Sequence, residues 1–244
     1  MEKRGQVTIF IVVAIIIIGA VGLYFSLRGG LKQQVLSPET EGVYLFVQSC
    51  IEETGEDAVH NIGQNGGYFL APEFSTSGGI PYYYSEGKNY MPSKERVGAE
   101  VSRYVNEMLF FCTRNFIDFP DFEISQEDVK TETRIGDNKI ILNVEYPLRI
   151  IKGESTSIIR EFNNIEIPVR LGIVYDSIGS IIQNQLTHED ICLSCILDIA
   201  LENNLYVDML DYDEETLIFV IRDKTSKINE KDFEFIFANR YQIE

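Results

Sequence analysis

The residues best suited to do chemistry lie in the segment HEDICLSC, at positions 188–195. His188, Cys192 and Cys195 stand at positions i, i+4 and i+7, which share one face of a helix. Imidazole and thiolate groups are zinc ligands, so these three residues could hold a metal ion. A Cys-x-x-Cys pair can also perform thiol–disulfide exchange. Because a second Cys-x-x-Cys and a thioredoxin-like strand and helix are missing from the sequence, we favour a structural disulfide or two core cysteines.

Cys50 and Cys112 are the other two cysteines of the chain. Each lies on the apolar side of a predicted helix, so the two can face each other if these helices pack side by side. In an extracytoplasmic compartment such a pair would be oxidised. We therefore predict a Cys50–Cys112 disulfide, with two small buried thiols as the alternative. The connectivity stays open, because four cysteines allow three full pairings.

Four carboxylates crowd one predicted hairpin turn near the C-terminus. They are Asp211, Asp213, Glu214 and Glu215. Carboxylate oxygens are the ligands that calcium prefers, so the turn could hold this ion. The spacing matches no EF-hand loop, and we therefore interpret the cluster as a solvated turn.

The sequence contains no recognisable catalytic constellation. Its two histidines are His60 and His188. It has no G-x-S-x-G, no H-E-x-x-H and no phosphate-binding G-x-x-x-x-G-K-[ST] motif. We therefore predict no enzyme activity and no cofactor.

A tyrosine-rich loop is the candidate contact surface. Residues 68–92 are rich in glycine, proline and tyrosine, and Tyr82, Tyr83, Tyr84 and Tyr90 cluster there. Tyrosine buries a large ring while keeping a polar tip, which suits interfaces. These side chains either meet a neighbouring molecule or cover the helices of their own chain.

The composition describes a folded, acidic protein. The chain has 244 residues, of which 45% are hydrophobic, and 38 Asp and Glu against 21 Lys and Arg give a formal net charge of −17. An electrostatic field of this sign repels phosphate backbones, so nucleic-acid binding is excluded as a leading function. It also disfavours lying flat on an anionic membrane.

The N-terminal segment predicts a membrane anchor. Residues 7–27 carry no charge, and a helix of this length spans the hydrocarbon core of roughly 30 Å. We assign residues 1–6 to a cytoplasmic tail or leader and 28–36 to a linker. Basic residues flank the span on both sides and nearly balance the positive-inside rule. The short N-terminal tail and the four cysteines favour a cytoplasmic N-terminus and an extracellular body.

The body should be α+β in two parts, residues 37–120 and 121–244. A Ser-Pro pair at Ser37 and a capping Ser93 predict two helices of a hairpin joined by the tyrosine-rich loop. The later elements follow from alternating and helical hydrophobic patterns. They comprise a meander of strands at 122–134, 139–151 and 157–167, helices at 169–185 and 187–202, and a hairpin with a last strand that form a second small sheet.

The start of the chain resembles a known kind of signal. KRGQ followed at once by an apolar helix is similar to an archaeal prepilin-type (type IV pilin-type) leader. The resemblance implies cleavage between Gly5 and Gln6 and packing of the apolar helix into a filament. Many such pilins carry Glu five residues into the mature chain, where this sequence has Phe10. The segments GQVTIF, SCIEETGEDAVHNIGQNGGY and FEFIFANRY also resemble single-pass surface proteins of small-genome archaea, which implies location and architecture only.

These observations predict a membrane-anchored, extracytoplasmic structural or interaction protein of the archaeal cell surface. Its most specific form is a pilin-like filament subunit. The predicted partners are membrane lipid through residues 7–27, further copies of the chain or another surface protein, and no nucleic acid. One alternative is a membrane-tethered ligand-binding or sensor module. Another is a thiol-redox or metal-dependent enzyme that uses the Cys-x-x-Cys pair.

Overall fold

The computed structural model describes most of the chain after the N-terminal segment. The described residues are 13, 17, 19, 38, 40–188 and 191–241. Contacts divide the chain into two units, Met1–Ser37 and Pro38–Glu244. The predicted leader site, linker and membrane span therefore lie outside the described residues, apart from three positions of the span. None of the helices within the described part is long and apolar enough to cross a membrane.

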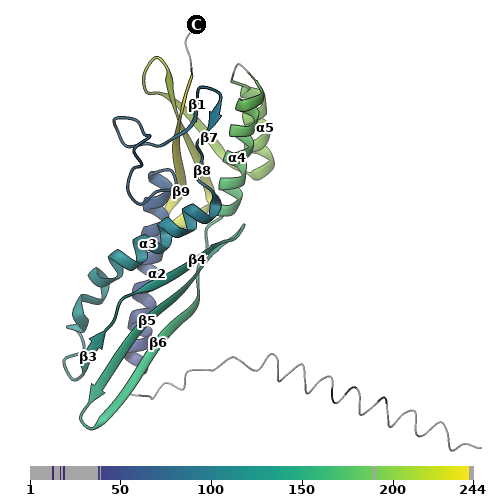
Figure 1. Ribbon diagram of the computed structural model, residues 1–244. Coiled ribbons are helices and arrows are strands. Elements are labelled where there is room, and N and C mark those ends of the chain that lie inside the picture. Colours follow the sequence, from purple (N-terminus) through teal and green to yellow (C-terminus); the bar gives the residue numbers. More distant parts are fainter. Residues whose placement is uncertain are drawn as a thin grey trace, which may run out of the picture. The chain divides into compact units, whose positions relative to one another are not determined.

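Two long helices, α2 (Glu41–Gln64) and α3 (Lys94–Thr113), form the predicted hairpin and pack side by side (Figure 1). The Ser93 hydroxyl accepts a hydrogen bond from the Arg96 amide at 3.2 Å, which confirms the predicted cap of α3. α2 begins at Glu41 with Thr40 at its N-cap position, a few residues later than the sequence predicts. A short 3-10 helix, η1 (Arg114–Phe116), follows α3.

The predicted meander is a sheet built around one long strand. Its strands are β3 (Glu123–Gln126), β4 (Lys130–Ile135), β5 (Ile140–Lys152) and β6 (Ser155–Ile167). β6 pairs with one edge of β5, while β3 and β4 share its other edge. The strand predicted over 122–134 is thus two strands. The break faces Pro147 of β5, which has no backbone N–H to donate.

The second sheet has five strands in the order β2-β1-β9-β8-β7. Its strands are β1 (Tyr82–Ser85), β2 (Lys88–Asn89), β7 (Tyr206–Asp211), β8 (Thr216–Ile228) and β9 (Lys231–Arg240). β1 pairs parallel to β9, and the other pairs are antiparallel. β7 forms one edge. The hairpin and last strand are as predicted, whereas β1 and β2 fall in a segment predicted to be a loop.

Aromatic rings fill the core of the five-stranded sheet. Tyr83, Phe219, Phe235 and Phe237 are fully buried, and the Phe237 ring stacks on Tyr83 and Phe219 at centroid distances of 4.8 and 5.1 Å. Such rings contribute large buried apolar areas.

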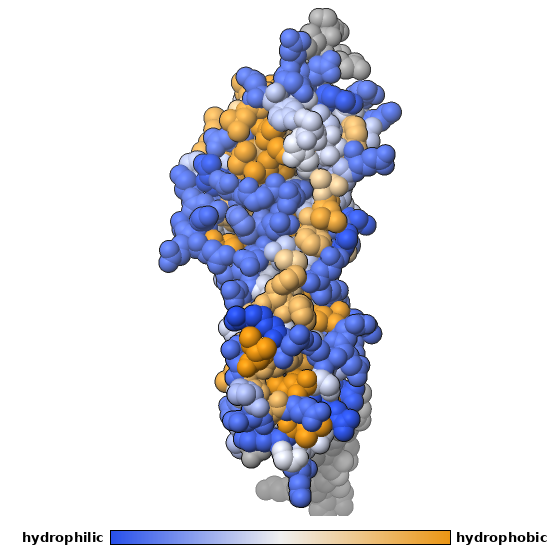
Figure 2. All heavy atoms as spheres, turned by 90° about the vertical axis from the view of Figure 1, so that its left-hand side faces the viewer, coloured by the Kyte–Doolittle hydropathy of each residue, from blue (hydrophilic) through white to orange (hydrophobic). Residues whose placement is uncertain are grey.

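The described residues make an α+β fold with two sheets. Hydrophilic side chains cover most of the face drawn in Figure 2, where apolar side chains form one area near the top and a stripe that runs from the middle of the face toward its lower end.

Two shorter helices, α4 (Leu171–Thr187) and α5 (Leu193–Asn203), lie between β6 and β7 in the sequence and pack against each other. The sequence predicts the second of them from Thr187 to Glu202. In the structure α4 continues to Thr187, and α5 begins only at Leu193. The residues predicted to form one helical face with His188 therefore belong to different segments.

Candidate functional site

Helix α5 exposes much of its apolar surface. Ile196 and Ala200 are buried, whereas Leu193, Leu197 and Leu201 are 61%, 58% and 69% exposed. The three leucines stand four residues apart, so they form one stripe along the helix. Contiguous exposed apolar surface of this kind is typical of binding sites.

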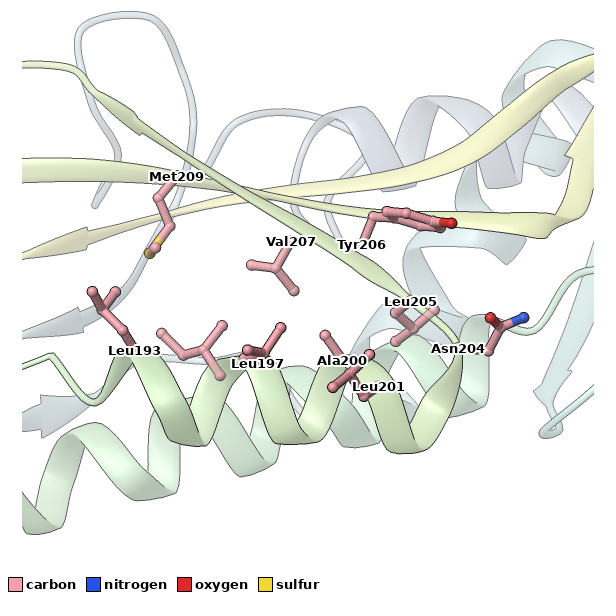
Figure 3. Close-up of a pocket in the computed structure, with 10 residues that line it drawn as sticks. Leu193, Leu197, Ala200, Leu201, Asn204, Leu205, Tyr206, Val207 and Met209 are labelled. Atoms are coloured by element: carbon pink, nitrogen blue, oxygen red, sulfur yellow. The ribbon is translucent and has the colours of Figure 1, made fainter.

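The stripe forms one wall of an apolar groove. The groove lies between α5 and β7 and encloses about 430 Å³. In Figure 3 the labelled leucines of α5 point toward the strand, and Val207 and Met209 point back from β7. Leu205 and Asn204 close the end where the helix turns into the strand, and the two elements diverge from there (Figure 3). The groove is therefore a wedge, closed at the turn and open toward Leu193.

A tight turn fixes the closed end. Asn204 has a left-handed backbone conformation with φ of 53°, and asparagine adopts this conformation more readily than most residues. Its N–H donates to the carbonyls of Ala200 and Leu201, and the Leu205 N–H donates to Ala200 O at 2.8 Å. These bonds satisfy the last carbonyls of α5 and start β7 at a fixed angle.

A buried ion pair fastens the two helices to the sheet. Asp223 of β8 is fully buried and accepts from Arg170 Nε at 2.9 Å and Nη2 at 2.8 Å. Arg170 immediately precedes α4, and its Nη2 also donates to the Asn203 carbonyl at the end of α5 at 3.1 Å. One guanidinium group thereby joins α4, α5 and β8.

The Asp223 carboxylate is held in its charged form. Burial alone raises its pKa, but hydrogen bonds from Arg170, Ser226 and Thr225 outweigh burial and lower the pKa from 3.8 to about 2. The Ser226 hydroxyl donates to Asp223 Oδ2 at 2.6 Å and accepts from the Arg170 amide at 2.9 Å. The carboxylate is thus fully paired at neutral pH and anchors the helices rigidly.

β7 leaves one edge of its sheet open. It pairs with β8 on one side, and its other side has no strand partner among the described residues. Tyr206 and Leu210 on this strand are 48% and 53% exposed. An unpaired edge strand presents backbone N–H and C=O groups that can pair with a strand of another chain. The open edge and the leucine stripe of α5 are next to each other.

The elements around the groove carry acidic charge. Residues 171–221 contain ten Asp and Glu and no Lys or Arg. Asp198 and Glu202 are exposed on α5, and Asp208 and Asp211 are exposed on β7. Two cations from β8 also reach this strand. Arg222 pairs with Asp208 at 3.3 Å, and Lys224 Nζ lies 3.7 Å from the centre of the Tyr206 ring.

A disulfide joins Cys192 and Cys195 at the open end of the groove. Cys192 is the N-cap of α5, and its sulfur accepts a hydrogen bond from the Cys195 amide at 3.3 Å. Both residues are half-buried. Leu193, which stands between them in the sequence, lines the groove. The disulfide therefore lies directly beside the apolar surface.

In the described part of the chain, neither the zinc hypothesis nor the calcium hypothesis finds a set of ligands placed to hold an ion. His188 ends α4 in an extended conformation, so it does not share a helical face with Cys192 and Cys195. The disulfide also consumes both thiolates that would bind zinc. Across the described part of the chain, no group of three or more His, Cys, Asp or Glu is placed to hold a metal ion. This includes the carboxylate turn, where Asp213 instead accepts from the Glu215 amide at 3.0 Å.

The tyrosine cluster is mostly core rather than contact surface. Tyr82 and Tyr83 are buried in β1, and the Tyr83 hydroxyl donates to the Gly66 carbonyl at 2.9 Å. Tyr84 is half-buried near the Tyr241 ring, and only Tyr90 is exposed, at 41%. The prediction of a loop was wrong for Tyr82, Tyr83 and Tyr84, because pairing of β1 with β9 places them in a sheet.

The second disulfide joins Cys50 of α2 to Cys112 of α3, as the sequence predicts for facing helices. Their Cα atoms are 5.6 Å apart, and Cys50 is only 2% exposed. This bond joins the two helices of the hairpin, and neither cysteine lines the groove between α5 and β7. It has a structural role.

Sequence reasoning missed the groove itself. The signal was present in LSCILDIALEN, where apolar residues occupy both sides of a short helix, which is unusual for a surface helix. The long stretch without Lys or Arg was a second signal. The chain matches no protein-family model, no curated protein and no solved structure. The geometry of the groove and its disulfide therefore carries the functional interpretation.

Proposed function

We propose that the protein is a membrane-anchored, extracytoplasmic interaction protein that binds an extended, apolar and cationic segment of a partner protein in the groove between α5 and β7. The observation that carries this proposal is the exposed leucine stripe beside the open edge of β7. The anchor is the uncharged segment 7–27, and the extracellular location of the body follows from the topology that the sequence predicts.

The apolar wall supplies the driving force for binding. Burying one exposed leucine side chain contributes about 1.5–3 kcal/mol, and three leucines stand in line here. Part of this gain offsets the entropy that association costs. A groove of this kind therefore suits a partner that covers all three leucines at once.

The open edge selects the conformation of the partner. An extended segment can add to β7 through backbone hydrogen bonds, while its alternate side chains cover the leucine stripe of α5. The added strand satisfies the free backbone groups of β7 and shields the apolar wall in one step. A partner helix would shield the leucines but leave the strand edge unpaired.

The charge selects the composition of the partner. The exposed carboxylates on both walls attract Lys and Arg and speed association at low salt. A second copy of this chain would bring the same acidic residues against each other. We therefore choose a cationic partner over self-association at this surface.

Peptide binding tests the groove. A short synthetic peptide in which Val and Leu alternate with Lys is titrated with the full-length chain in detergent, and fluorescence anisotropy reports binding. Leu197→Ser should weaken binding roughly tenfold or more, because it removes one of the leucines that the bound peptide would cover. Leu45→Ser is the matched control, since Leu45 of α2 is 54% exposed but lies away from the groove. Equal affinities for both variants would refute the proposal.

A pilin-like filament subunit is the second candidate, and the basic-Gly-Gln start before the apolar segment favours it. Mass spectrometry of the native N-terminus separates the two forms. A chain that begins at Gln6 supports prepilin processing, and an intact Met1 argues against it. Electron microscopy of the cell surface then shows whether filaments contain the chain.

A further inference from the structure

We infer that the Cys192–Cys195 disulfide is a thiol–disulfide exchange site for cysteine-containing proteins held in the groove. This inference rests on the proposed function, because the groove brings the partner to the disulfide. Leu193 belongs both to the Cys-Leu-Ser-Cys ring and to the wall of the groove. A segment bound along the leucine stripe therefore ends beside the two sulfurs.

The N-terminus of α5 favours exchange at Cys192. Helix N-termini carry partial positive charge, which stabilises a thiolate. The Cys195 amide already donates to the Cys192 sulfur at 3.3 Å, and the Ser194 hydroxyl lies 3.6 Å from it. The same groups would stabilise Cys192 as a thiolate after the disulfide opens. Cys192 is consequently a good leaving group in the second step of exchange.

The exchange transfers two electrons from a dithiol partner to the Cys192–Cys195 disulfide. One partner thiol loses its proton to solvent, and its thiolate attacks the Cys192 sulfur. The Cys192–Cys195 bond breaks, Cys195 takes the electron pair and a proton, and a mixed disulfide with Cys192 forms. The second partner thiolate then attacks the partner sulfur of this bond and releases Cys192. The partner is oxidised to a disulfide by two electrons, and Cys192 and Cys195 are reduced to a dithiol.

The fold permits this bond to open. The disulfide spans a sequence separation of 3 within one helical turn, so it holds no distant elements together. The ion pair of Arg170 with Asp223 and the turn at Asn204 position α5 independently of it. The Cys50–Cys112 disulfide is different, because it joins two helices and one of its cysteines is buried. Exchange should therefore favour Cys192–Cys195 over Cys50–Cys112.

A reduced peptide tests the inference directly. The oxidised full-length chain in detergent is mixed with the Val-Leu-Lys peptide carrying two cysteines, and free thiols are alkylated and located by mass spectrometry. Cys192 and Cys195 should become alkylated while the peptide gains a disulfide in equal amount. Cys50 and Cys112 should stay oxidised. An intact Cys192–Cys195 bond, or equal reduction of both disulfides, would overturn the inference.

Matched peptides and variants test the role of the groove. Replacing each Lys of the peptide by Glu should slow exchange roughly tenfold or more, because binding supplies the effective concentration of the attacking thiol. Leu197→Ser should have the same effect, and Leu45→Ser none. A peptide with a single cysteine should be trapped as a mixed disulfide on Cys192 when the Cys195 thiol that it releases is alkylated at once, before that thiol re-forms the Cys192–Cys195 bond. Equal rates for both peptides, or attachment at Cys195, would contradict the mechanism.

Binding and exchange can fail separately. The double variant Cys192→Ser, Cys195→Ser cannot exchange, so its affinity for the peptide reports the groove alone. Tight binding to this variant together with an unreactive disulfide in the wild type would overturn the exchange and leave the proposed function standing. Loss of peptide binding in both proteins would overturn the proposed function instead.

Discussion

The two disulfides of this protein lie in opposite settings. Cys50–Cys112 joins α2 to α3 across a sequence separation of 62, whereas Cys192–Cys195 closes a separation of 3 at the start of α5. In the chain-entropy model the first bond stabilises the fold by about 4 kcal/mol and the second by about 2 kcal/mol at most. The first joins two helices of the scaffold, and the second lies beside an apolar groove.

The difference also concerns what surrounds each bond. In the long-range disulfide Cys50 is 2% exposed and Cys112 is half-buried, while both cysteines of the local disulfide are half-buried at a helix end. Exchange begins when a thiolate reaches one of the two sulfurs, and the local disulfide offers two half-buried sulfurs where the long-range bond offers one. The Cys192–Cys195 disulfide is therefore better placed for exchange than the Cys50–Cys112 disulfide.

Removal of the long-range disulfide should have the largest effect. We expect the double variant Cys50→Ala, Cys112→Ala to lose about 4 kcal/mol of unfolding free energy, because its unfolded chain is freed from a long loop. Urea unfolding followed by circular dichroism measures the loss. A change below about 1 kcal/mol would show that helix packing alone holds the hairpin.

Loss of the buried Arg170–Asp223 ion pair should have the second-largest effect on stability. Arg170→Ala leaves the fully buried Asp223 carboxylate without its cation and should cost about 3 kcal/mol. Arg222→Ala is a suitable control, because Arg222 pairs with Glu234 at a more exposed place and should cost less than about 1 kcal/mol. If both variants unfold at the same urea concentration, the Arg170–Asp223 ion pair does not hold α5 in place. The position of α5 would then depend on other contacts when the Cys192–Cys195 disulfide is open.

Acid should weaken the same anchor. The pKa of Asp223 is lowered to about 2 in the folded protein, so its contribution is complete above its ordinary pKa of 3.8 and is lost as pH falls toward 2. The loss amounts to about 2 kcal/mol. The free energy of unfolding, measured with urea across this pH range, should therefore decline less steeply with falling pH in Asp223→Asn than in the wild type. Parallel pH profiles would assign the acid sensitivity to other carboxylates.

Local sequence signals predicted the elements that depend on local chemistry. The capping serine at Ser93 and the two long strands of the meander, β5 and β6, are where the patterns place them. The Cys50–Cys112 bond follows from two amphipathic stripes that face each other. These features need only neighbouring residues or a simple hairpin, so one sequence is sufficient to find them.

Features that depend on distant residues were not predictable. Tyr82–Ser85 becomes a strand because β9, far along the chain, pairs with it. The strand predicted over 122–134 is divided opposite Pro147, which lies on the neighbouring strand β5. The groove exists because Arg170 and Asp223, 53 residues apart, set the position of α5 against β7. No local pattern encodes such a placement.

Removal of the local disulfide should have the smallest effect on stability. The double variant Cys192→Ala, Cys195→Ala should lose less than about 2 kcal/mol, since the bond closes only one helical turn. Its α5 stays attached through the Arg170 guanidinium and the Asn204 turn, so peptide affinity should not change. A loss as large as that of the Cys50–Cys112 variant would make both disulfides structural. A bond that the fold needs so strongly could not open for a partner, and the contrast between the two would disappear.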